Sequence, residues 1–394
     1  MKKSYLFCFI LVVTLFLFQF QLFTQNLNSP LLARTSNLAS NQNSNQEKNS
    51  VKDIISLFTG KNTSVSGQWF LGFQAGEKDG KEFNYFHLKR GYIDIKTKLS
   101  ASLSGKITPD IAVDHEGDGE GDIEMRLKYC YLKYSLPGFL IFSKPYFEFG
   151  LVHRPWLSFE EHINQYRVQG TMFLERNKIL NSADYGITFY SDFGGSVNKN
   201  YLKRTGSSLT GKYGCMTVGI YNGGGYHAIE KNKNKTIEGR MTIRPFNKLI
   251  PGLLLSYFGV HGKGNTEMAT DWTLNKGFIS FEEKYFIVTG TYYDGCGNSA
   301  GSFVNDLNES LHQMGYSFFS ELKLLGKKFS VLDRYDYFKF ENESVDKYNE
   351  RYIVGVAYHF YKKCKVLVDY DMCKFSNSEI KDESVFEAAI EVSY

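Results

Sequence analysis

The sequence lacks the features that mark helical membrane proteins and nucleic-acid-binding proteins. Beyond the first 33 of its 394 residues there is no second long apolar run, which excludes a helical membrane protein past the N-terminus. Its formal net charge is only +4, so composition gives no support to nucleic-acid binding. With 7 prolines against 36 glycines, the composition is also unlike that of most helix-rich soluble enzymes.

Metal-site and catalytic motifs are lacking as well. None of the six cysteines has C-x-x-C spacing, which argues against a zinc site. No G-x-S-x-G, P-loop or dinucleotide-binding glycine motif occurs in a suitable context, so we expect no enzyme and no cofactor. Five cysteines follow the N-terminal segment, and this odd number requires at least one free thiol or an intermolecular bond. They are Cys130, Cys215, Cys296, Cys364 and Cys373.

The N-terminus has the pattern of a secretory signal peptide at residues 1–33. Lys2 and Lys3 supply the positive charge, and residues 6–20 form an apolar stretch that is short for a spanning helix. The cleavage position stays open, and an uncleaved anchor helix is the alternative. Residues 34–65 follow as a linker rich in Ser, Asn and Gln, with a short helix expected at 51–58, and the main domain is expected at 66–394.

The main domain combines abundant aromatic residues with a strict alternation of apolar and polar side chains. The chain has 33 Phe and 27 Tyr, and aromatics make up 16% of it. Such a period of two predicts strands with one face toward lipid and the other toward water, as in an all-β transmembrane antiparallel barrel. Alternate apolar positions at the C-terminus are Phe386, Ala388, Ile390, Val392 and Tyr394. A second predicted lipid face consists of Ile123, Met125, Leu127, Tyr129 and Tyr131.

The alternation predicts sixteen strands, an even number as a bacterial barrel requires. If both termini lie in the periplasm, connections after odd-numbered strands should be long and those after even-numbered strands short. Segment 193–206 does not fit, and a wrongly assigned strand there would change the count to 14 or 18. The predicted strands are 66–75, 83–98, 100–114, 122–135, 145–154, 184–192, 208–222, 236–245, 252–262, 268–281, 285–294, 312–324, 327–340, 350–361, 364–374 and 385–394.

Four short stretches resemble the phosphate-selective porin O/P family. They are residues 86–94 (FHLKRGYID), 107–111 (ITPDI), 148–156 (EFGLVHRPW) and 333–338 (DRYDYF). The resemblance implies a 16-stranded porin over residues 66–394, and its members are often trimeric. Phosphate selectivity in that family rests on a ladder of Arg and Lys along one wall. The mixed charges expected in this lumen give no ground for carrying that selectivity over.

The resemblance to porins further implies that the connection after the fifth strand, residues 155–183, folds into the lumen. Residues 158–161 (SFEE) form a capping box with Ser158 as N-cap, so we expect a short helix there and a second helical piece at 172–179. A constriction lined by opposite charges sets ion selectivity; an external loop whose charges face water is the alternative. The predicted constriction residues are His153, Arg154, Glu160, Glu161, Arg167, Arg176 and Lys178.

Inward-facing positions carry both signs of charge, which predicts a water-filled lumen because unpaired charge in a dry one is too costly. The predicted lining residues are Arg126, Lys128, Glu148, Arg240, Arg244, Arg351, Lys365 and Asp369. The acidic, glycine-rich segment 114–122 offers Asp118, Glu120 and Asp122 as oxygen ligands for Ca²⁺. It lacks the twelfth-position glutamate of an EF-hand, and a solvated external hairpin is the alternative.

These patterns predict a porin of the bacterial outer membrane. Ions and small hydrophilic solutes, with anions such as phosphate as candidates, would diffuse passively through it. Its expected partners are outer-membrane lipid, those solutes and further copies of the chain, a trimer being what the family implies. The alternative is a structural or adhesive barrel with a blocked lumen. A barrel enzyme is a weaker third hypothesis.

Overall fold

The computed structural model of the chain describes residues 62–114, 119–341, 347–377 and 379–394. Within these residues the chain forms sixteen strands. The strands are β1 Thr63–Lys78, β2 Lys81–Lys98, β3 Leu103–Val113, β4 Ile123–Ser135, β5 Phe142–His153, β6 Ala183–Phe193, β7 Gly214–Tyr221, β8 Thr236–Ile243, β9 Leu253–Lys263, β10 Asp271–Glu282, β11 Phe286–Cys296, β12 His312–Leu324, β13 Phe329–Phe340, β14 Lys347–Tyr361, β15 Cys364–Phe375 and β16 Glu383–Ser393. The short helices are α3 Leu157–Ile163, α4 Phe173–Arg176, α5 Lys199–Thr205 and the 3₁₀ turn η2 Leu325–Lys327. The predicted signal peptide and the helix at 51–58 lie outside the described residues.

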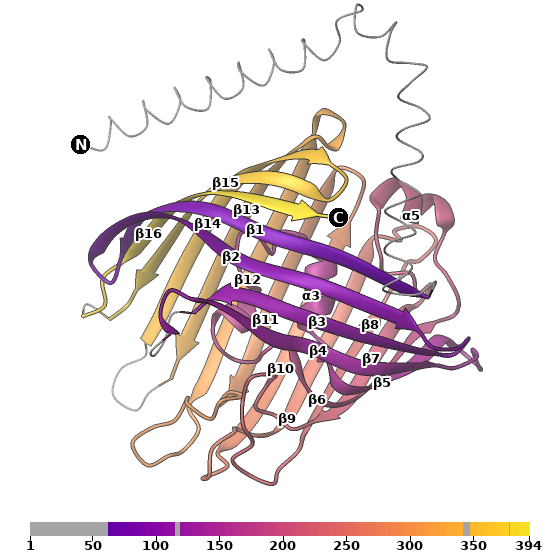
Figure 1. Ribbon diagram of the computed structural model, residues 1–394, viewed down its shortest axis with the longest axis horizontal. Coiled ribbons are helices and arrows are strands. Elements are labelled where there is room, and N and C mark those ends of the chain that lie inside the picture. The colour runs from indigo at the N-terminus through magenta and orange to yellow at the C-terminus, as the bar shows by residue number, and fades with distance from the viewer. Residues whose placement is uncertain (1–61, 115–118, 342–346, 378) are drawn as a thin grey trace, which may run out of the picture. The chain divides into compact units, whose positions relative to one another are not determined.

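Every strand pairs antiparallel with its neighbours in sequence, and the sheet closes where β1 meets β16. Leu71 of β1 lies opposite Ile390 of β16, although 319 positions separate them. The strands are strongly tilted and curve round into the closed barrel (Figure 1). The predicted all-β antiparallel barrel and its strand count are confirmed. Closure leaves no free sheet edge, the condition for placing β-structure in lipid.

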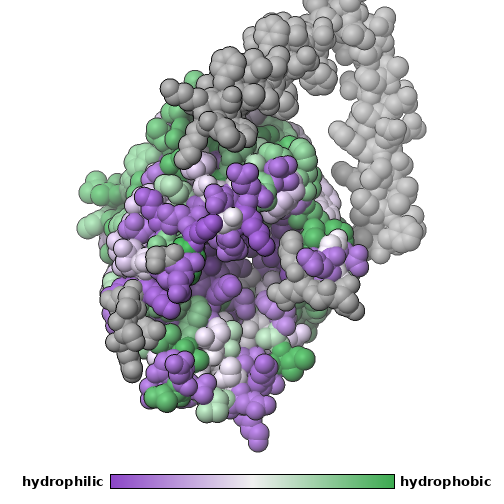
Figure 2. All heavy atoms as spheres, turned by 90° about the vertical axis from the view of Figure 1, so that its left-hand side faces the viewer, coloured by the Kyte–Doolittle hydropathy of each residue, from purple (hydrophilic) through white to green (hydrophobic). Residues whose placement is uncertain are grey.

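The burial pattern of the strands is the reverse of that in a soluble protein. In β8, Glu238 and Arg240 are buried, whereas Ile237 and Met241 are 57% and 44% exposed. Exposed apolar side chains of this kind need lipid, not water, around them. Figure 2 shows one end of the barrel, where hydrophilic residues surround a hollow and hydrophobic ones lie on the flank. Among the described residues, no helix is long and apolar enough to cross a membrane.

Because of a bulge in β4, part of one predicted lipid-facing set of residues points into the barrel instead. The pairing with β3 shifts between Thr108 and Pro109, which lie opposite Tyr129 and Leu127, so Lys128 is left over. An unpaired residue reverses the in-and-out phase of every position beyond it. Tyr129 is therefore buried, although the alternation predicted that it faces lipid with Leu127. The same prediction fails for Tyr131, whose ring packs against the ring of His153 with centroids 5.4 Å apart.

The connections mostly follow the predicted rule. We call the end of the barrel with the connections after odd-numbered strands the loop end, and the opposite end the short-turn end. Turns after even-numbered strands are short, as in 283–285 and 362–363. The exceptions are 194–213 between β6 and β7, the segment that fitted poorly in the sequence, and the two-residue turn 79–80 after the odd-numbered β1. Segment 194–213 contains α5, which Asn198 caps through its side chain and Gly206 ends in the left-handed conformation at φ 79°. The strand count is unaffected by this long connection.

Candidate pore

The 154–182 connection between β5 and β6, which we call the inserted loop, folds into the barrel. Its apolar side packs on the inner wall of β9 and β10: Trp156 stacks on Phe258 at 5.5 Å between ring centroids and meets Phe278 edge-on at 5.2 Å. These rings belong to one buried cluster that includes the loop, residues of every strand from β9 to β16, and Phe70 of β1. The inner face of this wall is apolar, whereas the alternation in the sequence predicted polar and charged residues on the inner face. The inserted loop thus fills one side of the lumen.

Buried ion pairs fix the first part of the inserted loop to the wall. Arg154 donates to Glu238 of β8 through Nε at 2.8 Å, and both side chains are 0% exposed. Nζ of Lys276 on β10 lies 3.2 Å from the Glu160 carboxylate and 4.1 Å above the Trp156 ring. Arg154 and Glu160 were predicted to line the constriction. The structure buries both of them in these contacts, so they anchor the loop instead of facing water.

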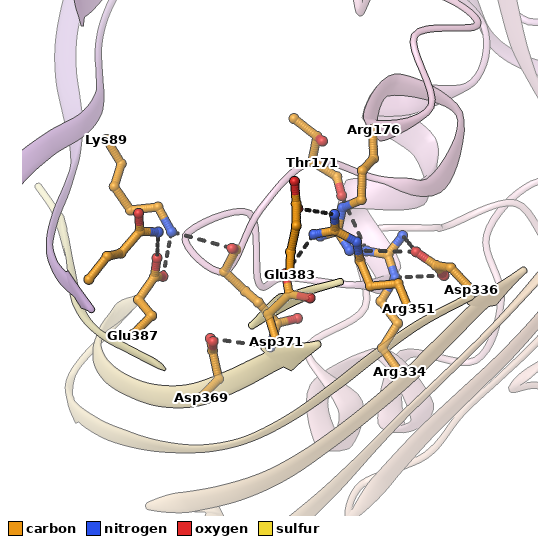
Figure 3. Close-up of polar contacts among 12 residues, drawn as sticks. Lys89, Thr171, Arg176, Arg334, Asp336, Arg351, Asp369, Asp371, Glu383 and Glu387 are labelled. Atoms are coloured by element: carbon orange, nitrogen blue, oxygen red, sulfur yellow. Dashed lines mark hydrogen bonds and ion pairs between the residues drawn. The ribbon is translucent and has the colours of Figure 1, made fainter. Parts of the chain in front are cut away.

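The far edge of the inserted loop reaches the opposite wall. Nζ of Lys89 on β2 donates to the Val168 carbonyl at 2.5 Å and pairs with Glu387 of β16. Arg334 of β13 donates to the Thr171 carbonyl at 3.2 Å. Figure 3 shows the contacts of Lys89 with Glu387 and of Arg334 with Thr171, and it shows Arg176, Arg334 and Arg351 gathered around acidic residues of β13, β15 and β16. The loop is therefore held at both sides of the barrel.

Accessible charges lie toward β2–β5 and on the facing side of the inserted loop, and Arg351 of β14 and Asp371 of β15 are exposed to a similar degree, 23% and 21%. Arg90 of β2, paired with Asp110 at 3.1 Å, is 24% exposed, and Arg126 of β4 is 33% exposed. On the loop, Arg167 lies 3.2 Å from Glu161, which is 25% exposed, and 3.6 Å from Glu175. These exposures contrast with the fully buried pairs on the β8 side. Charges of both signs thus border the open part of the lumen.

Two charged groups of the inserted loop have shifted acidity. Burial raises the pKa of Glu161, and the neighbouring Lys128 and Arg167 oppose that shift only in part. Burial also lowers the pKa of Arg176, and the positive charge of Arg334 adds to the effect. The carboxyl of Glu161 therefore keeps its proton to a higher pH than an exposed glutamate does.

The helices of the inserted loop differ from the prediction. Helix α3 has Trp156, not Ser158, at its N-cap position, and no side chain caps it. The Trp156 indole N–H instead donates to Glu160 at 2.5 Å, inside the loop's packed interior. The predicted capping box is wrong, because Glu161 at its last position pairs with Arg167. Helix α4 is shorter than the predicted piece at 172–179, since the chain turns at Lys178 with φ 57°.

The remaining predicted residues are spread over the lumen. Lys178 is exposed, and His153 stacks on Tyr129 at 4.0 Å and lies 3.1 Å from Glu148. Of the other predicted lining residues, Lys128, Glu148 and Asp369 are buried. Arg240 is buried on β8 and Arg244 is buried directly after that strand. Arg351 pairs with Asp371, Lys365 pairs with Glu391, and Asp369 accepts from Gln169.

Sequence reasoning missed two further parts of the lumen. Residues 222–235 between β7 and β8, the mouth loop, also turn inward at the loop end, where the Tyr226 hydroxyl donates to Asp110 at 3.2 Å. At the short-turn end, the α5 segment crosses toward β10, and the Tyr201 hydroxyl donates to the Glu282 carbonyl at 3.2 Å. Only the poor fit of 193–206 to a short turn hinted at either.

The structure gives no support to the Ca²⁺ site predicted in segment 114–122. Glu120 and Asp122 are exposed, and Asp118 lies outside the described residues. Among the residues that the structure describes, no group of three or more His, Cys, Asp or Glu side chains could hold a metal ion. The five cysteines after the N-terminal segment are all free thiols.

Comparison with known proteins finds similarity in structure alone. No protein-family model matches the sequence, and no curated protein matches it. The anion-selective porin from Comamonas acidovorans has a TM-score of 0.59 at 10% identity, over 84% of this chain and 99% of that one. OmpF of Salmonella typhi, in a complex with daunomycin, has a TM-score of 0.58 at 12% identity, over 84% and 98%. OmpT of Vibrio cholerae, in a trimer form, has a TM-score of 0.53 at 13% identity, over 84% and 99%.

Identities this low establish the fold only. Together with the closed barrel and its lipid-facing apolar side chains, they identify the chain as a transmembrane β-barrel with the fold of bacterial outer-membrane porins.

Proposed function

We propose that the protein is a diffusion porin, whose water-filled channel runs along β2–β5 and passes ions and small hydrophilic solutes. The observation that carries this proposal is the contrast between the two sides of the lumen. Arg154 and Glu238 on the β8 side are completely buried, whereas Arg90 and Arg126 on the other side are 24% and 33% exposed. Partly exposed charges inside a barrel require water around them, and a 16-stranded barrel is wide enough to hold it.

We further propose that the channel favours anions weakly. Most cations that border it are neutralised by carboxylates, as Arg90 is by Asp110 and Lys106 is by Asp94. Two lysines of β4 differ: Lys128 lies over the Tyr92 ring and Lys133 over the Tyr146 ring. In the part of the chain that the structure describes, neither forms an ion pair with a carboxylate. Lys133 is partly exposed, so its charge can act on passing ions, whereas Lys128 is only 5% exposed and lies near Glu161.

Phosphate selectivity is the narrower candidate, and it has less support. The stretch 86–94 that resembles the phosphate-selective family supplies Lys89 and Arg90 to the lumen. Each is paired with a carboxylate, Glu387 and Asp110 respectively, which weakens a site for a small divalent anion. A general preference for anions fits these contacts better than a dedicated phosphate site.

The reversal potential of the purified protein in a planar bilayer, under a KCl gradient, tests the selectivity. Replacing both lysines, Lys128→Gln with Lys133→Gln, should shift the potential toward cation selectivity while conductance steps persist. Lys363→Gln, at an exposed position in the turn between β14 and β15, is the matched control and should leave it unchanged. Equal potentials for all three proteins would contradict the proposed role of the two lysines.

A structural or adhesive barrel with a blocked lumen is the second candidate. It is favoured by the three segments that occupy the interior, namely the inserted loop, the mouth loop and the α5 segment. In the α5 segment, Arg204 pairs with Glu283 and its carbonyl accepts from Lys327 at 2.6 Å. This candidate predicts a folded barrel that conducts no ions, so conductance separates it from the porin.

We also propose that the protein assembles into a homotrimer. Support comes from the family resemblance and from the trimer form of OmpT of Vibrio cholerae, whose fold is similar. Mass determination in mild detergent tests this: a species of three chains is expected, and a monomer at all concentrations would contradict it.

A further inference from the structure

Two connections at the short-turn end carry charge of one sign only. Segment 194–213, which contains α5, and the turn 244–252 between β8 and β9 have six Lys and Arg residues between them and no Asp or Glu. A surface with a concentration of one sign of charge attracts ligands of the opposite sign. These connections are therefore the place to look for an anion site outside the lumen.

The side chain of Arg244 holds the two connections together. It lies directly after β8, is 3% exposed, and donates through Nε to the Gly211 carbonyl at 3.1 Å. A second guanidinium nitrogen donates to the Leu209 carbonyl at 2.9 Å, and the third donates to the Pro251 carbonyl. Because one buried side chain binds backbone from both connections, the space between them has a defined shape.

A cavity of about 620 Å³ lies between the two connections, a volume within the range of ligand-binding pockets. Its lining contains three cations, Arg204, Lys212 and Lys248, together with one serine and three asparagines. Among the residues that the structure describes, no carboxylate lines it. The cavity thus presents positive charge and uncharged hydrogen-bonding groups to a ligand.

Two of the three cations are not neutralised. Arg204 pairs with Glu283, but neither Lys212 nor Lys248 forms an ion pair with a carboxylate of the described part of the chain. Lys248 is exposed and Lys212 is partly exposed, with its Nζ 5.0 Å from the Tyr213 ring centroid. Accessible lysines beside amide groups are suited to binding a phosphate.

The rim of the cavity is apolar. Leu249 lines the cavity and is 81% exposed, and Phe246 and Ile250 of the same turn are exposed as well. The turn continues from β8, where Met241 and Ile243 belong to the lipid-facing side of the barrel. Large apolar side chains exposed at the end of a barrel strand are suited to the boundary between lipid and water. A ligand that matches both the cavity and its rim has a phosphate head and acyl chains.

We propose that this cavity binds an anionic phospholipid, with phosphatidylglycerol as the simplest representative. The phosphate would contact Lys212 and Lys248, and the glycerol hydroxyls would bond to the asparagine side chains. A zwitterionic lipid fits less well, because its ammonium group would meet cations and find no carboxylate. Basic pockets at membrane surfaces recognise anionic head groups in the same way. Short turns of outer-membrane barrels face the periplasm, so the lipid would come from the inner leaflet.

The test compares two lipids with identical acyl chains by native mass spectrometry of the refolded protein in detergent. Phosphatidylglycerol should bind at least about fivefold more tightly than phosphatidylcholine, the factor that one nearby lysine supplies. Inorganic phosphate at millimolar concentration should not displace it, because free phosphate makes no contact with the apolar rim.

Variants locate the site. Lys212→Gln with Lys248→Gln should weaken binding of phosphatidylglycerol about fivefold or more and leave that of phosphatidylcholine unchanged. The matched control is Lys362→Gln with Lys363→Gln, which removes the same charge from two exposed positions of the turn after β14 at the same end of the barrel. It should leave both affinities unchanged. Heat-modifiable migration in gels verifies that each variant is folded.

Three results would overturn the inference. Equal binding of the two lipids would remove the preference for an anionic head group, and an equal loss in both double variants would show a general effect of charge. Displacement by inorganic phosphate would make the ligand a soluble anion. The proposed channel function does not depend on any of these outcomes.

Discussion

The buried pair of Arg154 and Glu238 allows a quantitative test of how the inserted loop is held. Both side chains are 0% exposed, and the guanidinium carbon also lies 5.0 Å from the Trp272 ring centroid. Arg154→Met keeps much of the packing but leaves the Glu238 carboxylate buried without its cation. Removing one partner of such a pair costs about 3–5 kcal/mol. We expect a loss of that size in the free energy of unfolding.

A second variant isolates the cause of that loss. Replacing both partners, Arg154→Met with Glu238→Met, removes the unpaired charge and should recover most of the stability, because apolar residues often substitute for a buried pair at little cost. Arg126→Met is the control: its pair with Glu124 is about one-third exposed on both sides, so at most about 1 kcal/mol should be lost.

Urea unfolding in lipid vesicles, monitored by tryptophan fluorescence, measures these differences in the free energy of unfolding. Planar-bilayer recordings report the effect of each variant on the inserted loop through the channel conductance. Arg154→Met should also give noisier and larger conductance steps, since the loop loses an anchor. The reasoning is refuted if Arg154→Met lies within about 1 kcal/mol of the wild type. It is equally refuted if the double variant is as unstable as the single one.

Two further predictions concern the constriction. Because burial raises the pKa of Glu161, lowering the pH from 7 to 5 should remove negative charge from the constriction. The reversal potential should then shift toward anion selectivity; Glu161→Gln should abolish that response, and a variant that kept it would contradict this origin. A Cβ at Gly315 would come within 2.8 Å of the Phe173 ring and 2.5 Å of a backbone carbonyl oxygen. Gly315→Ala should therefore cost about 1–3 kcal/mol of stability, whereas Gly239→Ala, with open space around it, should cost little; equal losses would argue against close packing of the loop.

The architecture was predictable because lipid and water impose a period of two on nearly every strand. Strand β8 is the plain case: Glu238 and Arg240 point inward between exposed Ile237 and Met241. The bulge at Lys128 was not predictable, since a local insertion leaves no mark on composition, and Tyr129 was assigned to the wrong face.

The roles of the loop residues were less accessible to sequence reasoning. The partners of Arg154 and Glu160 are Glu238 and Lys276, which lie 84 and 116 positions further along the chain. The charges of Arg154 and Glu160 suggested that both residues line a constriction. Only tertiary packing decides whether such a charge faces water or a counter-ion. The basic residues Lys89 and Arg90 lie in the stretch 86–94 that resembles the phosphate-selective porin family, but they were not predicted to line the lumen.

The central claim is that an open water path lies along β2–β5, and single-channel recording tests it most directly. The purified, refolded protein in a planar bilayer, verified as a heat-modifiable barrel, should give discrete and reproducible conductance steps in KCl. The absence of steps from correctly folded protein would contradict the claim and favour a barrel whose interior is closed by its own loops.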